Sequence, residues 1–150
     1  MNRIKKIYVF IIIGLIVICT FIFEPFRSES PTPKITTGKT VIPTTQGSFC
    51  WDGPLFTRCV DKIYSSPLEM AKVHKPMKVS PNQEIRIKFK RKPLAGTLQV
   101  EEWRDKKNIK NIKVKDAKIL APKEKGVYIY HVMANWKDGS GNHAFSIEVK

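Results

Sequence analysis

The sequence is poor in the residues that define several protein classes, with three cysteines, eight glycines and ten prolines among 150 residues. So little glycine and proline excludes collagen-like and low-complexity disordered chains, and three cysteines cannot support a disulfide-dense miniprotein. The length excludes a multi-domain enzyme. Acidic residues are also scarce, with 13 against 27 Lys and Arg, which gives a formal net charge of +14.

Motifs of known chemistry are lacking as well. The chain contains no G-x-S-x-G nucleophile motif and no glycine-rich phosphate loop. Glu101 and Glu102 are neighbours on an expected strand, so they point to opposite faces and cannot act as a paired acid and base. His131 and His143 fall on opposite faces of an expected hairpin and cannot share a metal ion. We expect a protein that is not an enzyme and that holds neither a metal nor a cofactor.

The longest uncharged run covers residues 7–23 and reads IYVFIIIGLIVICTFIF. As an α-helix it would be about 25 Å long, at the short end for a bilayer core of about 30 Å. Arg3, Lys5 and Lys6 precede the run, and the positive-inside rule places such residues in the cytoplasm. We therefore expect a single-pass anchor in the cell membrane over residues 1–23, with the rest of the chain outside the cytoplasm.

Two alternatives involve processing of this segment. A cleaved signal peptide needs small residues after a shorter apolar stretch, whereas Phe21, Ile22 and Phe23 are bulky. A bacterial lipoprotein would be cut before Cys19, but Ile18 stands where a small residue is usual. An uncleaved anchor agrees best with the sequence, and Cys19 would then be a thiol within the membrane.

Residues 24–45 change in composition to EPFRSESPTPKITTGKTVIPTT. The four prolines favour an extended backbone, and the serines and threonines offer little to bury. We expect a spacer between the membrane and a folded domain. The segment Lys39–Ile42 is the part that would instead form a first edge strand.

Residues 46–150 show the period-2 pattern of half-buried strands and are expected to form the domain. In Glu84–Phe89 the apolar side chains alternate with charged ones, and similar alternation surrounds Val100 and Ile112. Ser66–Glu69 has the N-cap, proline and glutamate of a short helical start. Many short strands separated by turns predict an all-β antiparallel sandwich.

The final hairpin allows a prediction of strand register. If Asp138–Gly141 form its loop, the even-numbered apolar residues of the first strand meet odd-numbered apolar residues of the second. The pairs on this face are then Ala134–Phe145, Val132–Ile147 and Tyr130–Val149.

Gly126, Tyr128 and Tyr130 form a G-x-Y-x-Y pattern, which often carries a tyrosine corner in strand F of immunoglobulin-like domains. In these strands and in size, the chain resembles an immunoglobulin-like β-sandwich, although the Cys…Trp…Cys arrangement of antibody domains is missing. This resemblance implies a fold and no function.

Three segments also resemble small, uncharacterised, membrane-anchored proteins of Gram-positive bacteria. They are Gln46–Trp51, Ser66–Glu69 and Gly126–Tyr130. The resemblance implies a setting in the cell envelope and supplies no activity.

Cys50 and Cys59 are expected to form a disulfide, because thiols outside the cytoplasm are oxidised. Closing this ten-residue loop stabilises the fold by about 2.5–3 kcal/mol in the chain-entropy model. The loop carries Trp51, Leu55 and Phe56, which either pack into the core or form a recognition knob. In the second case the loop would provide shape for binding an envelope component, or it would act as an inhibitor or regulator of an extracytoplasmic enzyme.

The positive charge is the last signal. With the three basic residues before the uncharged run set aside, the net charge is still +11. The residues expected to form a basic patch are Lys88, Lys90, Arg91, Lys92, Arg104, Lys106, Lys107 and Lys110. Such a run is either a solvated face or a site for an anionic lipid, a wall polymer or an extracytoplasmic protein. Nucleic acid is disfavoured, because Trp103 is the only aromatic residue at the basic stretch Arg104–Lys118.

The sequence therefore predicts a membrane-tethered, non-enzymatic binding domain outside the cytoplasm, with an anionic envelope component as its preferred ligand. The alternative is an inhibitor that acts through the Cys50–Cys59 loop. The sequence makes no prediction of the oligomeric state.

Overall fold

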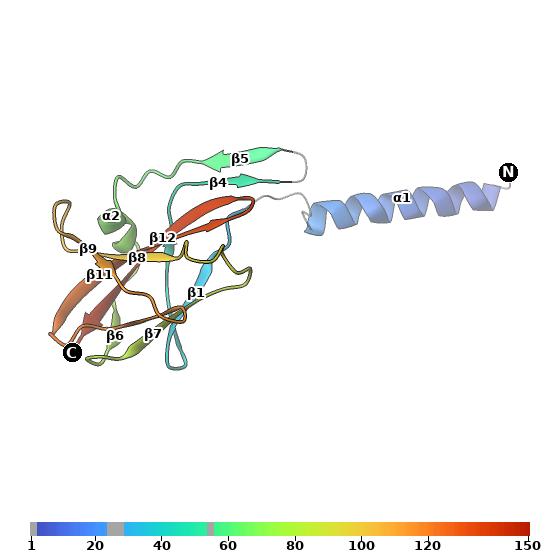
Figure 1. Ribbon diagram of the computed structural model, residues 1–150. Helices are drawn as coiled ribbons and strands as arrows, with labels where there is room; N and C mark the ends of the chain where they lie inside the picture. The colour runs from blue at the N-terminus through green and yellow to red at the C-terminus, as the bar shows by residue number, and fades with distance from the viewer. Residues whose placement is uncertain (1–2, 24–28, 54–55) are drawn as a thin grey trace.

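The computed structural model describes residues 3–23, 29–53 and 56–150. Its elements are α1 (Arg3–Phe23), β1 (Pro33–Thr37), β2 (Thr40–Ile42), β3 (Thr45–Gln46), β4 (Phe49–Asp52), β5 (Thr57–Val60), α2 (Pro67–Ala71), β6 (Met77–Val79), β7 (Glu84–Phe89), β8 (Gln99–Trp103), β9 (Ile109–Ile112), β10 (Lys118–Leu120), β11 (Gly126–Trp136) and β12 (Gly139–Val149). Strands dominate everything after α1 (Figure 1).

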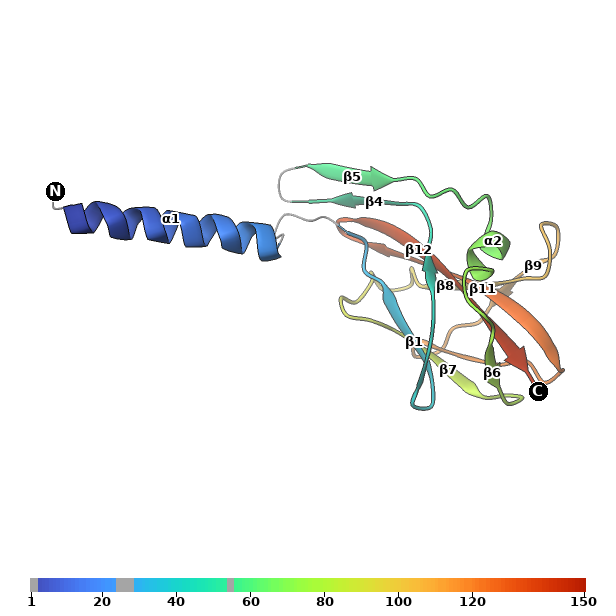
Figure 2. The same ribbon diagram turned by 180° about the vertical axis from the view of Figure 1, so that it is seen from behind.

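Helix α1 extends away from the sheets in both views of the ribbon (Figures 1 and 2). Its described apolar side chains are exposed all along the helix, from Ile7 at 58% to Ile18 at 54%. Over the residues that the structure describes, no helix combines the length and hydropathy needed to cross a membrane.

The strands form two sheets that pack face to face. The smaller sheet has the order β10-β7-β1-β2, and the larger has the order β5-β4-β12-β11-β8-β9. Strand β3 also pairs with β12, and β6 pairs with β12 in the parallel direction, whereas the other pairings between strands are antiparallel. This all-β sandwich agrees with the predicted fold class and is compatible with an immunoglobulin-like domain.

The core lies between the two sheets. Strand β7 alternates between exposed and buried residues as predicted, and its Ile85 and Ile87 are almost fully buried. The larger sheet contributes Tyr130 and Phe145, whose rings stack with centroids 5.1 Å apart. Burying each such side chain stabilises the fold by about 1.5–3 kcal/mol, so this inner layer is the main source of stability.

The segment expected to be a spacer is part of the sandwich from Pro33 onward. Strand β1 lies between β7 and β2, and its Ile35 pairs with Ile87 and is completely buried. The spacer prediction is therefore wrong for residues 33–45. The alternative was right in part, because residues 40–42 form β2 at the edge of the smaller sheet and Ile42 is buried, but β1 and not this segment is the first strand.

The register of the final hairpin differs from the prediction. Tyr130 pairs with Phe145 and Trp136 with Gly139, so only Lys137 and Asp138 form the turn. Residues 139–141 belong to β12, because Gly139 and Ser140 pair with β4. This pairing needs a glycine at position 139, where φ is +148° and an added Cβ would collide with the Cys50 carbonyl oxygen. The register is displaced by four residues, an even number, so each side chain keeps its predicted face.

Two local predictions involve side-chain hydrogen bonds. The Tyr128 hydroxyl donates to the carbonyl oxygen of Glu124 at 3.0 Å, which is the expected tyrosine corner. At the start of α2, the Glu69 carboxylate accepts a hydrogen bond from the Ser65 backbone N–H at 2.8 Å, and this contact lowers the pKa of Glu69. Ser66 occupies the N-cap, but its side chain makes no capping bond. The capping interaction therefore lies one residue earlier than a standard capping box.

Candidate functional site

The β4–β5 hairpin carries the predicted disulfide, with Cys50 directly opposite Cys59. Because side chains alternate along a strand, an outward Cys50 places Trp51 inward. Trp51 is only 5% exposed, and its ring packs edge-on against Trp136 with the Arg91 guanidinium above it. Of the two alternatives that the sequence left open, Trp51 takes the packed one, and it is not an exposed residue of a recognition knob.

Of the rest of the predicted recognition loop, the structure describes Phe56, which directly precedes β5. Phe56 is 60% exposed, whereas Leu55 lies outside the described residues. Only one aromatic side chain of the loop is thus exposed among the residues that the structure describes. A stapled loop with a single exposed aromatic offers much less contact area than the predicted knob.

The predicted basic patch is divided between opposite ends of the sandwich. One group lies on β7 or directly after it and comprises Lys88, Lys90, Arg91 and Lys92, while the other surrounds the β8–β9 turn and comprises Arg104, Lys106, Lys107 and Lys110. The Arg91 carbonyl accepts a hydrogen bond from the Trp136 indole, so the first group lies at the β11–β12 turn. Trp103 pairs with Ile129, so the second group lies about seven residues away along β11, roughly 20 Å. The expectation of one continuous patch is therefore wrong.

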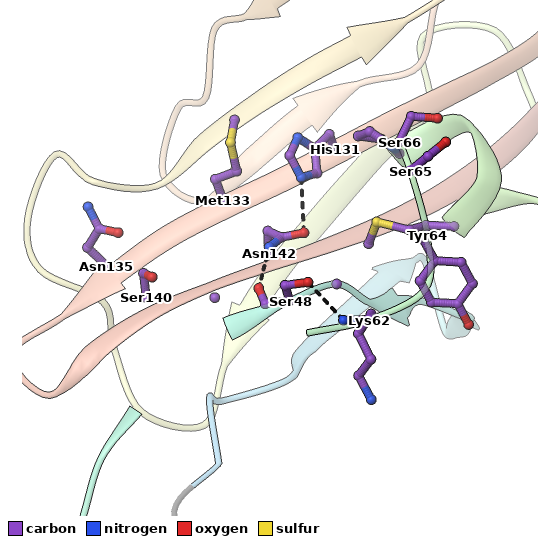
Figure 3. A pocket seen from close by; sticks show the side chains of 14 residues that line it. Ser48, Lys62, Tyr64, Ser65, Ser66, His131, Met133, Asn135, Ser140 and Asn142 are labelled. Atoms are coloured by element: carbon purple, nitrogen blue, oxygen red, sulfur yellow. Dashed lines mark hydrogen bonds between the residues drawn. The ribbon is translucent and has the colours of Figure 1, made fainter. Parts of the chain in front are cut away.

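A pocket lies on the outer face of β11 and β12, between α2 and the segments around Ser48 and Tyr64 (Figure 3). We call it the helix-side pocket. Its volume is about 410 Å³. It is lined by Gly47, Ser48, Lys62, Tyr64, Ser65, Ser66, Pro67, Met70, His131, Met133, Asn135, Ser140, Gly141 and Asn142.

A chain of hydrogen bonds fixes the floor of the helix-side pocket. The Trp103 indole N–H donates to the Glu101 carboxylate at 2.9 Å, and the same Glu101 oxygen lies 3.4 Å from His131 Nδ1. On the other side of the ring, His131 Nε2 lies 3.2 Å from Asn142 Oδ1 (Figure 3). Asn142 Nδ2 donates to the Ser48 carbonyl at 2.7 Å, which turns Oδ1 toward the histidine. Because Oδ1 can only accept, Nε2 carries a proton.

The walls of the pocket are fixed by backbone contacts. Gly47 donates its N–H to the Asn142 carbonyl at 2.9 Å, and a Cβ at this glycine would collide with the Asn142 side chain. The Ser48 hydroxyl accepts a hydrogen bond from the Lys62 N–H at 2.9 Å, which ties the two wall segments together. Little reorganisation is therefore needed before a ligand binds.

The lining favours a particular ligand chemistry. Lys62 and His131 are its ionisable cationic groups, and the lining residues that the structure describes include no carboxylate. The remaining lining combines hydroxyl and amide side chains, among them Ser140, Tyr64 and Asn135, with the apolar side chains of Pro67, Met70 and Met133. Such a surface complements a ligand that is rich in hydroxyl groups and carries negative charge.

The other ionisable groups singled out from the sequence lie away from this pocket. His143 is completely buried on the inner face, opposite to His131, as the sequence predicts. Glu102 is also buried on the inner face and accepts a hydrogen bond from Arg104 at 3.1 Å, whereas Glu101 faces His131. Within residues 3–23, 29–53 and 56–150, no three metal-ligating side chains cluster.

Sequence reasoning missed the helix-side pocket. The alternation along β11 places His131 and Met133 on the outer face, and this was the only signal for it. Most of the wall comes from residues 47–48 and 62–67, which have no recognisable motif and reach the hairpin only through tertiary contacts.

Comparisons of the chain with family models, curated proteins and solved structures found no match. The function must therefore be argued from the fold, the helix-side pocket and the distribution of charge.

Proposed function

We propose that the protein is a membrane-tethered binding domain outside the cytoplasm, without catalytic activity. Its ligand is an anionic, hydroxyl-rich component of the cell envelope, bound in the helix-side pocket. The observation that carries this proposal is the lining of that pocket, where Lys62 and His131 stand among hydroxyl and amide groups. A ligand phosphate or carboxylate would pair with Lys62, and sugar or glycerol hydroxyls would bond to the remaining polar groups.

The support for a tether is helix α1. It exposes apolar side chains along its length, and a helix that is apolar on all sides is stable in lipid or against a partner. Arg3, Lys5 and Lys6 precede the apolar run, so the sandwich would lie on the outer side of the membrane.

The strand order supports an immunoglobulin-like domain. Strands β1, β7 and β10 correspond to A, B and E, and strands β12, β11, β8 and β9 correspond to G, F, C and C′. Tyr128 then makes its corner at the start of strand F. The segment from β2 to α2 is an insertion after the first strand, and it supplies one wall of the helix-side pocket.

The absence of catalysis is proposed from the hydrogen bonding of His131. Its Nε2 proton is donated to Asn142, and its Nδ1 faces the Glu101 carboxylate. Neither ring nitrogen is directed at a hydroxyl or thiol that it could activate as a nucleophile. The histidine thus serves to shape the pocket floor.

Titration calorimetry on the full chain in detergent micelles tests this proposal. The probe is poly(glycerol phosphate), with dextran as an uncharged polymer that is also rich in hydroxyl groups. Lys62→Glu should weaken binding of the phosphate polymer by at least about tenfold, as expected when a charged hydrogen bond is replaced by repulsion. Lys78→Glu, at an exposed position on β6, makes the same charge change away from the pocket and should leave the affinity nearly unchanged.

Equal weakening by Lys62→Glu and Lys78→Glu would show that net charge alone drives binding and would refute the pocket as the site. The alternative function, inhibition of an extracytoplasmic enzyme by the β4–β5 hairpin, has less support because Trp51 is buried. Phe56 is left as its exposed aromatic among the described residues.

A further inference from the structure

The chain enters the sandwich at one particular end. Strand β1 begins at Pro33, which pairs with Phe89 at the last position of β7. Nine residues, 24–32, connect the end of α1 to this point. Even fully extended they would span only about 30 Å, so this end of the sandwich stays near any membrane that holds α1.

Three connections meet at this end. They involve the end of β4 with the start of β5, the β11–β12 turn and the segment that follows β7, and all lie on the side of α1 (Figures 1 and 2). The Asp52 N–H donates to the Asp138 carbonyl at 2.6 Å, and the Trp136 indole donates to the Arg91 carbonyl at 2.9 Å. These bonds join the three connections into one surface, which we call the membrane-proximal surface.

The membrane-proximal surface combines exposed apolar and basic side chains. Phe56 is 60% exposed and Leu94 is 51% exposed. Lys90, Lys92 and Lys137 are also exposed. Lysines around one or two projecting apolar residues are the composition of a surface that contacts lipid headgroups.

The acidic side chains of this surface are already engaged. Asp138 forms an ion pair with Arg91, and Asp52 accepts a hydrogen bond from the Thr57 hydroxyl at 2.6 Å. Asp52 keeps its negative charge, because a hydroxyl does not neutralise a carboxylate, but it is outnumbered by the three lysines, to which the described residues show no ion pair.

We infer that the membrane-proximal surface rests on anionic phospholipid headgroups of the membrane that holds α1. Lys90, Lys92 and Lys137 contact the phosphates, and Phe56 inserts at the boundary between headgroups and acyl chains. This inference depends on the proposed anchoring by α1, because the tether keeps the surface at high effective concentration near the lipid. Docking would fix the orientation of the sandwich relative to the membrane.

Energy transfer from tryptophan to lipid measures the docking. The full chain, carrying Trp103→Phe, is reconstituted in phosphatidylcholine vesicles with a dansyl-labelled headgroup lipid, with or without phosphatidylglycerol. The remaining tryptophans, Trp51 and Trp136, both lie at the membrane-proximal end. We expect transfer to be higher in the vesicles that contain phosphatidylglycerol and to fall with added salt.

Two matched triple variants separate local contact from net charge. The variant K90E/K92E/K137E should lower transfer to the level found in phosphatidylcholine alone. The variant K106E/K107E/K110E makes the same charge change at the far end of the sandwich and should keep the transfer of the parent protein. Phe56→Ser should also lower transfer, even though it leaves the charge unchanged.

Equal effects of the two triple variants, or transfer that does not depend on phosphatidylglycerol, would overturn the inference. A wash with alkaline carbonate identifies failure of the anchor itself. Release of the protein by carbonate would overturn both anchoring and docking. Retention of the protein with no dependence on phosphatidylglycerol would overturn docking alone and leave the proposed anchor intact.

Discussion

His143 makes the stability of the sandwich sensitive to mild acid. Its side chain is completely buried on the inner face of β12, and neither ring nitrogen has a hydrogen-bond partner among the described residues. Removal from water, together with the nearby His131, lowers the pKa of His143 from 6.5 to about 4. Folding therefore favours the neutral ring, because a charged imidazole would be buried without compensation.

The sign of the effect follows from proton binding in the two states. Between pH 6.5 and pH 4 the unfolded chain carries a proton on His143 and the folded chain does not, so acid favours unfolding. Since one pKa unit corresponds to about 1.4 kcal/mol, the free energy of unfolding should fall by about 2 kcal/mol from pH 7 to pH 5. The part of the loss that His143 causes should reach about 3 kcal/mol by pH 4 and then level off.

Urea denaturation of the full chain in micelles, followed by tryptophan fluorescence at several pH values, measures this loss. His143→Leu removes the titrating group and should remove the part of the loss between pH 7 and pH 5 that His143 causes. His74→Leu, at an exposed loop position, should retain the slope of the parent protein. Carboxyl groups whose pKa is lowered, such as Glu84 and Asp105, titrate below this window. If His143→Leu keeps the full acid sensitivity, the reasoning is refuted.

Three further predictions concern stability at neutral pH, each measured by the urea midpoint of the full chain. Replacing Cys50 and Cys59 together by serine should cost about 2.5–3 kcal/mol, the loop-closure contribution for their separation of nine residues; an unchanged midpoint would contradict it. Tyr128→Phe removes the hydrogen bond to the Glu124 carbonyl and should cost about 1 kcal/mol, whereas no loss would show that the corner is not stabilising. Ile35→Ala should cost about 2–5 kcal/mol because the side chain is fully buried, whereas the same change in an exposed spacer would cost little. Val41→Ala, at a half-exposed position, should cost much less than Ile35→Ala.

Much of the sandwich could be predicted because its strands have a clear local sequence pattern. Strand β7 has the expected bounds, and its strict alternation reflects one face on the core and one in water. The disulfide followed from two cysteines in a chain expected to lie outside the cytoplasm. The opposite faces of His131 and His143 also followed, because only the parity of the register was needed.

The first strands could not be predicted because their stability comes from their neighbours. Strand β1 reads PKITT, in which Ile35 is the only aliphatic residue, and the local signal resembles that of an extended spacer. It becomes a strand because it pairs with β7 along one edge, where Ile85 and Ile87 are cross-strand neighbours, and with β2 along the other edge. Tertiary contacts of this kind override weak local preferences. The helix-side pocket was missed for the same reason, since its walls are brought together only by the complete fold.

The divided basic charge shows why a linear count of lysines is a poor guide to a binding surface. Lys92 and Lys106 are 14 residues apart, but strand β8 runs between them, so antiparallel packing sends them to opposite ends of β11. Each end must then be judged by its own surroundings. Arg104 at the far end pairs with the buried Glu102, whereas Lys92 lies beside exposed apolar residues on the side of α1. The two basic groups carry similar charge but have different surroundings, so we expect only the group near α1 to contact the membrane. The two matched triple variants measure this difference directly.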